Sequence, residues 1–159
     1  TAPPSDGPSG PLRLDAVRHT RPLADIKQVG ESTKTLYLRQ AVARGFDDAA
    51  YVDADGRLSE ATIWNLVFWD GRAVVWSRAE MLDGITQQIV RRQLQRSGVP
   101  QRTAELTPDD AARMAGAAVM NSWTPGVPVG AIGDAAIPVA GDFMQLLQGA
   151  YQAEPAVEV

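Results

Sequence analysis

The spacing of apolar positions along the chain predicts four helices. They cover Glu31–Arg44, Thr86–Ser97, a segment that starts at Thr107, and Asp142–Ala150. In the first of these, apolar residues recur three to four positions apart, as they do on one face of a helix. Ser32 can cap its start and Gly45 can end it. Thr107 is followed by Pro108 and two aspartates, a combination typical of a helix start.

Short runs of β-branched and aromatic residues predict strands between these helices. The predicted strands cover Ala49–Asp53, Asn65–Trp69, Arg72–Trp76, Val99–Leu106, Ala117–Met120, Val127–Ile132 and Ala135–Ile137, and an extended segment covers Leu12–Ile26. Asp70-Gly71 lies between two such runs and predicts a hairpin with a two-residue turn. Gly133-Asp134 predicts a second hairpin. Strands interleaved with helices indicate an α+β fold, with a mixed sheet and packed helices.

Composition argues against several classes of function. The net charge is -4, and no stretch concentrates Lys and Arg, so a nucleic-acid partner is not expected. The chain has no cysteine, and His19 is its only histidine, so neither a metal site nor a Ser-His-Asp triad is expected. No apolar run approaches the ~20 residues that a membrane-spanning helix needs. We therefore expect no membrane partner and a cytoplasmic location.

The two ends of the chain differ in composition from the rest. Residues 1–11 are rich in Pro, Gly and Ser, which predicts a disordered, linker-like segment. Residues 152–159 are expected to form an acidic tail, and residues 12–151 to form one domain. The chain does not begin with Met, which suggests a fragment, a processed chain or an excised domain.

Two short stretches carry an amine and an acid. Lys27 precedes the first predicted helix, and Lys34, the other lysine of the chain, lies on that helix and is expected to face solvent. Glu60 follows a predicted strand and turn, five positions before Asn65. A lysine amine and a carboxylate are the groups by which a protein holds and tunes pyridoxal phosphate (PLP).

Two further stretches can bind a phosphate. Gly84, Ile85 and Thr86 open the second predicted helix, where unpaired backbone N–H groups and the helix dipole attract an anion. Asn121-Ser122 follows a predicted strand and adds a second small polar group. The four stretches together supply what a PLP site requires.

The order and spacing of these stretches resemble the class IV, fold-type IV PLP enzymes. That family includes branched-chain and D-amino-acid aminotransferases and aminodeoxychorismate lyase. Lys27 lies eighteen residues before Gly45-Phe46-Asp47-Asp48-Ala49, which is similar to the distance from the family's catalytic lysine to its corresponding segment. The resemblance runs from about Arg21 to about Tyr151 and covers only the large C-terminal domain of the family. The small N-terminal domain has no counterpart in this chain.

The resemblance implies a role for each matching residue. Lys27 would hold PLP as a Schiff base and move the α-proton of the substrate. Glu60 would pair with the pyridinium nitrogen, and Asn65 would fix the local loop geometry. The residues implied in phosphate binding are Gly84, Ile85, Thr86, Asn121 and Ser122, and those implied on the substrate side are Trp123 and Thr124.

The activity that the resemblance implies is aminotransfer between an amino donor and a 2-oxo acid. The enzyme would be a homodimer, completed by the missing N-terminal domain or by a partner chain. Two alternatives stay open: a lyase of the aminodeoxychorismate type, to which Asn121-Ser122 is closer, and a non-catalytic module that keeps the fold. Gln87 stands where the family commonly has an arginine, and Ser32 where branched-chain enzymes have a tyrosine. These departures leave the substrate unassigned.

Overall fold

Strands and helices interleave along the chain in the computed structural model, which describes residues 7–28 and 30–156. Their order is β1 (Leu12–Arg18), α1 (Thr33–Ala43), β2 (Asp48–Val52), β3 (Leu58–Ala61), β4 (Asn65–Trp69), β5 (Val74–Ser77), α2 (Ile85–Arg96), β6 (Gln101–Ala104), α3 (Pro108–Ala112), β7 (Gly116–Asn121), β8 (Thr124–Ile132), β9 (Ala135–Ala136) and α4 (Gly141–Gln152).

The strands join one mixed sheet. β1 pairs in parallel with β2 and β8, and β5 pairs in parallel with β6, whereas the other pairs are antiparallel. The strand order is β3-β2-β1-β8-β7-β4-β5-β6, with β9 beside β8. Because β3 also pairs with β4, the sheet curls until it closes a ring of strands. The predicted α+β fold with a mixed sheet is confirmed.

Side chains that alternate along the strands separate an inner core from two outer layers. Leu14, Leu66 and Phe68 belong to a buried cluster that fills the inside of the curled sheet. Val67, between Leu66 and Phe68, belongs instead to a cluster shared with α2 and α4. Tyr51 belongs to a third cluster, under α1. This arrangement follows from the period of two that every strand imposes on its side chains.

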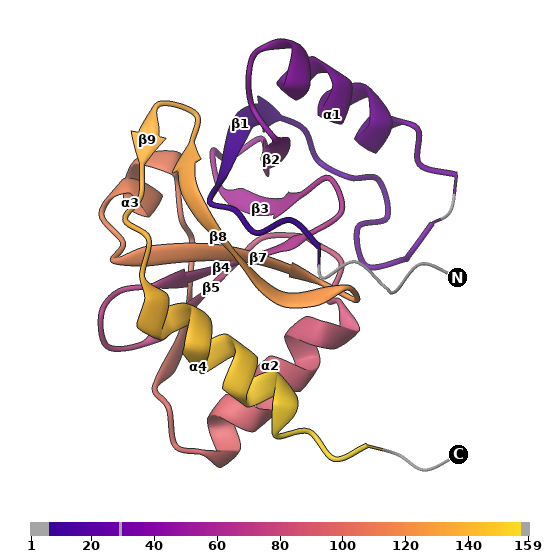
Figure 1. Cartoon of the computed structure of the whole chain (residues 1–159). Helices are drawn as coiled ribbons and strands as arrows, with labels where there is room; N and C mark the ends of the chain where they lie inside the picture. The colour runs from indigo at the N-terminus through magenta and orange to yellow at the C-terminus, as the bar shows by residue number, and fades with distance from the viewer. Residues whose placement is uncertain (1–6, 29, 157–159) are drawn as a thin grey trace.

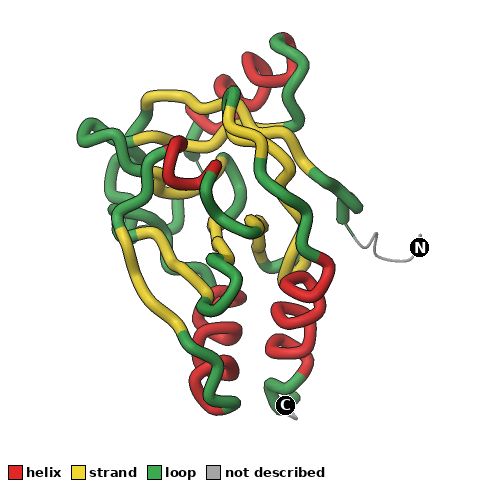
Figure 2. The backbone as a smooth tube through the Cα atoms, turned by 90° about the vertical axis from the view of Figure 1, so that its left-hand side faces the viewer, coloured by secondary structure: helices red, strands yellow, loops and turns green. Residues whose placement is uncertain are grey.

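The helices cover the sheet from two ends (Figure 1). α2 and α4 contact each other and lie side by side at one end, whereas α1 lies at the opposite end (Figure 2). None of the helices in the part of the chain that the structure describes is long and apolar enough to span a membrane.

The predicted helix positions agree with the structure, but one predicted cap is wrong. α1, α2 and α4 begin and end within two residues of their predicted bounds. Thr107 forms the capping box with Asp110 that its sequence predicts. Ser32 makes no capping hydrogen bond, because it adopts a helical rather than an extended backbone conformation. Gly45 follows α1 with a φ of +86°, as expected for a residue that ends a helix.

Three predictions about strands and turns are wrong. β1 ends at Arg18, so residues 19–26 form a loop rather than an extension of the strand. Asp70-Gly71 is not a two-residue turn. The carboxylate of Asp70 accepts hydrogen bonds from the N–H groups of Arg72 and Ala73, and β5 starts only at Val74. β3 was not predicted, because its four residues are all buried and show no alternation of apolar and polar side chains.

Candidate cofactor site

A cavity of about 480 Å³ opens where four parts of the chain meet. They are the loop between β1 and α1, the turn between β3 and β4, the segment before α2, and the end of β7. The lining residues are Arg21, Lys27, Gln28, Glu31, Lys34, Glu60, Thr62, Ile63, Trp64, Asn65, Leu82, Asp83, Gly84, Ile85, Asn121 and Ser122. All four stretches singled out in the sequence therefore reach one cavity. Thr86, Trp123 and Thr124 are the predicted site residues that do not line it.

Glu60 and Asn65 lie opposite each other where the sheet closes. They are register partners between β3 and β4, and both are buried. The side-chain Nδ2 of Asn65 donates to the carbonyl of Leu82 at 2.6 Å. This bond ties β4 to the segment that leads into α2, so the acid and the helix start are held at one place.

Glu60 is a buried carboxylate whose hydrogen bonding is incomplete. The residue is 3% exposed, and its Oε1 has no hydrogen-bond partner among the described residues. Burial raises the pKa of Glu60 to about 7, although the charge of Arg21 and a hydrogen bond from the N–H of Leu82 act in the opposite direction. An unpartnered buried oxygen favours the binding of a group that brings a proton.

Arg21 stands between two carboxylates. Its Nε lies 3.0 Å from Oε2 of Glu31 and 3.3 Å from Oε1 of Glu60. All three side chains are at most 10% exposed. The other oxygen of Glu31 accepts a hydrogen bond from the hydroxyl of Thr33, the first residue of α1. The loop that carries Lys27 is therefore anchored at both ends, beside Glu60.

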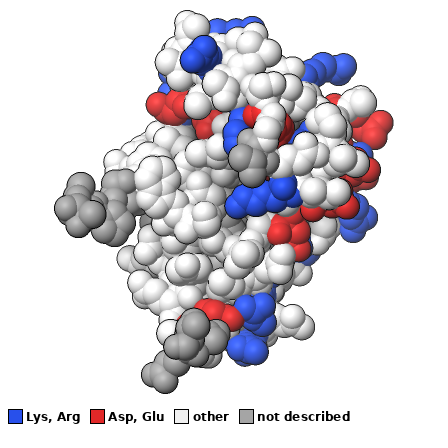
Figure 3. Space-filling view, turned by 90° about the vertical axis from the view of Figure 1, so that its right-hand side faces the viewer, with Lys and Arg blue, Asp and Glu red and all other residues white. Residues whose placement is uncertain are grey.

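Both lysines of the chain line the cavity. The expectation that Lys34 faces solvent is wrong: it is half-buried, because the first turn of α1 lies against the loop that carries Lys27. Neither lysine forms an ion pair with a described residue. Figure 3 shows the side of the molecule on which this loop lies, and side chains of both charges gather in its middle.

The start of α2 approaches β4 as closely as a glycine allows. A Cβ placed on Gly84 would lie 2.4 Å from Oδ1 of Asn65, so no other residue fits without displacing that side chain. Ile85 is exposed and Thr86 is buried, and as first-turn residues their backbone N–H groups have no partner within the helix. Gln87, which stands at the position of the family's arginine, donates to Oδ1 of Asp83 instead.

The turn between β7 and β8 brings the second predicted phosphate contact to the cavity. Oδ1 of Asn121 accepts from the N–H groups of Trp123 and Thr124, and its Nδ2 donates to the carbonyl of Ile63. Ser122 is exposed at the rim. Trp123 is 54% exposed and Thr124 is buried. Because neither of these two lines the cavity, their role on the substrate side stays a prediction.

Asp48 supports the cavity from below. Its carboxylate accepts hydrogen bonds from the Thr62 hydroxyl at 2.6 Å, from Nε1 of Trp64 at 2.9 Å, and from the N–H of Ala49. Burial raises the pKa of Asp48, and these hydrogen bonds lower it in part. Thr62 and Trp64 belong to the turn between Glu60 and Asn65, so Asp48 fixes the geometry of that turn.

Sequence reasoning missed Arg21, Glu31 and the role of Asp48. Arg21 and Glu31 come together with Glu60 only through the fold, and nothing in their spacing indicates this contact. Asp48 had a signal, because an acidic residue at the start of an apolar strand is unusual and calls for buried partners. Among the residues that the structure describes, no group of three or more His, Cys, Asp or Glu side chains is arranged to hold a metal ion.

The model of the family described as amino-transferase class IV matches residues 1–132. This match covers most of the chain, so the chain belongs to the class IV aminotransferase family, a family of PLP-dependent enzymes. No curated protein matches the chain.

Solved structures show the same fold. A protein named as a candidate 4-amino-4-deoxychorismate lyase from Legionella pneumophila aligns with a TM-score of 0.84 at 23% identity, over 92% of this chain and 57% of its own. The branched-chain aminotransferase of Thermoproteus uzoniensis aligns with a TM-score of 0.81 at 20% identity, over 91% and 51%. A hypothetical aminotransferase from Mycobacterium tuberculosis, in a PLP-bound form, aligns with a TM-score of 0.79 at 19% identity, over 88% and 55%. This chain spans little more than half the length of these three proteins.

Proposed function

We propose that this chain is the cofactor-binding domain of a PLP-dependent aminotransferase, which transfers an amino group between an amino acid or amine and a 2-oxo acid. The observation that carries the proposal is the carboxylate of Glu60. It is buried, it has an unpartnered oxygen, and it lines the same cavity as two lysines and the start of α2.

The residues of the cavity fit PLP group by group. The unpartnered Oε1 of Glu60 suits a protonated ring nitrogen. The close contact between Gly84 and Asn65 leaves the first N–H groups of α2 accessible to a phosphate. Lys27 supplies the amine that bonds to the cofactor aldehyde. When bound, PLP supplies an electron sink for the carbanion that forms at the substrate α-carbon.

The residues of this chain would then divide the work. Glu60 would keep the ring nitrogen charged, and the N–H groups of Ile85 and Thr86, with Asn121 and Ser122, would hold the phosphate. The Lys27 amine would take the proton from the substrate α-carbon and return it. A smaller domain, or a partner chain, would close the substrate side of the cavity and complete a homodimer.

The experiment compares Lys27→Ala with Lys34→Ala in the complete purified protein. Because both lysines line the cavity, Lys34→Ala is the matched control. Wild type and Lys34→Ala should turn yellow with PLP and, after borohydride reduction, carry a pyridoxyl group on the peptide that contains Lys27. Lys27→Ala should show neither signal. A wild-type protein that stays colourless, or a label on Lys34, would contradict the proposal.

A lyase of the aminodeoxychorismate type is the second candidate, favoured by the Asn121-Ser122 sequence. The two reactions release different products. An aminotransferase needs a 2-oxo acid acceptor and converts it to an amino acid, whereas the lyase releases pyruvate from aminodeoxychorismate without an acceptor. Product analysis with and without an added 2-oxo acid therefore separates them. PLP binding without either reaction would favour a non-catalytic module.

A further inference from the structure

One N–H group serves two carboxylates beside the cavity. The Nε of Arg21 lies closer to Glu31 than to Glu60, at 3.0 Å against 3.3 Å. Neither contact has the geometry of a hydrogen bond, since both Nε of Arg21 and Oε1 of Glu60 are buried without a hydrogen-bond partner. Glu31 is held in place by the hydroxyl of Thr33. The guanidinium is thus shared, and its nearer carboxylate is the one outside the predicted site.

The groups around Glu60 leave Arg21 as its main compensating charge. From β2, Asp48 and Tyr51 face this region, and neither brings a positive charge. Burial raises the pKa of Tyr51, and the charges of Glu31 and Glu60 raise it further. The remaining charged groups that line the cavity are Lys27 on the same loop, Lys34 on α1 and Asp83 before α2. None of these three forms an ion pair with Glu60.

Aromatic side chains close the space in which Arg21 could move. The ring of His19 packs 4.8 Å from Tyr51 and 4.9 Å from Tyr37. Nε2 of His19 and the hydroxyl of Tyr51 are both buried without a hydrogen-bond partner. Burial, the largest influence on it, lowers the pKa of His19, so this wall carries no charge that competes for the two carboxylates. Only the position of Arg21 decides how its charge is divided.

We propose that Glu31 is a positioning residue that draws Arg21 partly away from Glu60 and thereby leaves a Glu60 oxygen to bind the protonated ring nitrogen of the cofactor. This inference rests on the proposed function. Without Glu31, Arg21 would pair with Glu60 alone. The carboxylate that should receive the cofactor would then already have a cation as its partner.

The experiment titrates Glu60 directly in Glu31→Gln. Carbon-13 NMR of carboxyl-labelled glutamates follows the titration, and the Glu60 signal is assigned by its loss in Glu60→Gln. Glu31→Gln removes a negative charge and frees Arg21, so the midpoint of the Glu60 titration should fall by about one pH unit. Glu105→Gln is the matched control, because Glu105 also lies 3.0 Å from an arginine, Arg57, but on the surface. It should leave the midpoint unchanged.

The affinity for PLP gives a second measurement. Glu31→Gln should bind PLP about tenfold more weakly, a change that corresponds to roughly one pH unit of midpoint shift, while Lys27 is still labelled after reduction. Arg21→Gln should move the Glu60 midpoint upward, which tests the sharing independently if Glu31→Gln does not fold. An unchanged midpoint in Glu31→Gln would overturn the inference and reduce Glu31 to an anchor of α1.

The two failures are distinguishable. If wild type does not bind PLP at all, the proposed function fails, and the NMR titration still decides whether Glu31 holds Arg21 away from Glu60. If wild type binds PLP through Lys27 but Glu31→Gln leaves both the midpoint and the affinity unchanged, only the positioning role fails.

Discussion

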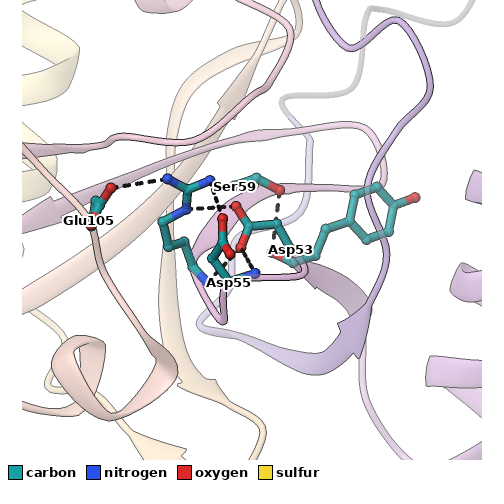
Figure 4. A network of polar contacts seen from close by, with 6 residues as sticks. Asp53, Asp55, Ser59 and Glu105 are labelled. Carbon is teal, nitrogen blue, oxygen red and sulfur yellow. Dashed lines mark hydrogen bonds and ion pairs between the residues drawn. The ribbon is translucent and has the colours of Figure 1, made fainter.

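Arg57 and Arg21 each share their charge among several carboxylates at the two ends of β3, but only the Arg57 cluster is complete. Nε of Arg57 donates to Asp53 at 2.8 Å, and its terminal nitrogens pair with Asp55 at 3.1 Å and Glu105 at 3.0 Å (Figure 4). Every nitrogen of this guanidinium has a partner. Arg21, in contrast, presents one buried N–H to two carboxylates and completes neither contact.

The two clusters shift carboxyl groups in opposite directions. Burial acts on Asp53, but hydrogen bonds from the backbone and side chain of Arg57 outweigh it and lower the pKa of Asp53 below its usual range. Burial dominates at Glu60 and raises its pKa to about 7. The Arg57 cluster therefore stabilises the turn before β3, whereas the Arg21 cluster keeps a carboxyl group unsatisfied until a ligand binds. Strain of this kind is typical of binding sites.

Asp48→Ala tests a buried carboxylate whose partners are complete, and the largest effect is expected there. The variant leaves Nε1 of Trp64 and the hydroxyl of Thr62 buried without an acceptor, which should lower the free energy of unfolding by about 3 kcal/mol. Urea denaturation at pH 6 measures it. Thr62→Val, which removes one of the three donors, should cost less. A loss of stability no greater than that of Thr62→Val would contradict the supporting role of Asp48.

Glu60→Gln tests the buried carboxyl group that lacks a partner. A folded-state pKa of about 7, against 4.5 in the unfolded chain, means that the folded protein binds the extra proton. The stability from this group is fully present below pH 4.5 and is lost as the pH rises through 7. Gln mimics the neutral acid, so the variant should be more stable than wild type at pH 8, on the order of 2 kcal/mol.

Urea denaturation of Glu60→Gln and wild type at pH 5 and pH 8 checks this prediction. The gain should shrink towards pH 5, and the variant should at the same time lose affinity for PLP. A destabilised variant at pH 8 would show that the charged form of Glu60 is well satisfied in the folded protein.

Gly84→Ala tests the contact that holds the helix start against Asn65. Gly84 has a φ of -63° and a ψ of 147°, which alanine adopts readily, so the cost comes only from the Cβ that would lie 2.4 Å from Asn65. We expect a loss of about 1–2 kcal/mol and weaker PLP binding. Gly149→Ala in α4 is the control, because its Cβ meets nothing within 4 Å, and it should stabilise the helix slightly. Equal effects of the two variants would contradict the prediction.

Arg57→Gln should have the smallest effect. Its ion pairs are partly exposed, and surface pairs of this kind contribute little and are screened by salt. We expect the thermal midpoint to fall by a few degrees, less so at high salt, with the Glu60 titration and PLP affinity unchanged. A change in either of the last two would show that the clusters at the two ends of β3 are coupled.

Local sequence signals predicted the elements that depend on neighbouring residues. The capping box at Thr107 needs only Asp110, three positions away, and the end of α1 needs only a glycine at position 45. The same reasoning misplaced Lys34 and Ser32. Whether a helical side chain faces solvent depends on what packs against the helix, and the loop that carries Lys27 packs there because of contacts that Arg21 makes with distant residues.

The sequence by itself determined which chemical groups the chain carries and their order: an amine at Lys27, an acid at Glu60 and a helix start at Gly84. Only the tertiary structure decided that these groups line one cavity and that Arg21 is divided between Glu31 and Glu60. The physical reason is range. Caps, turns and periodicity act over a few residues, whereas the pairing of β3 with β4 that closes the sheet depends on the packing of the whole core. That closure buries Glu60 and removes the water that would otherwise satisfy it.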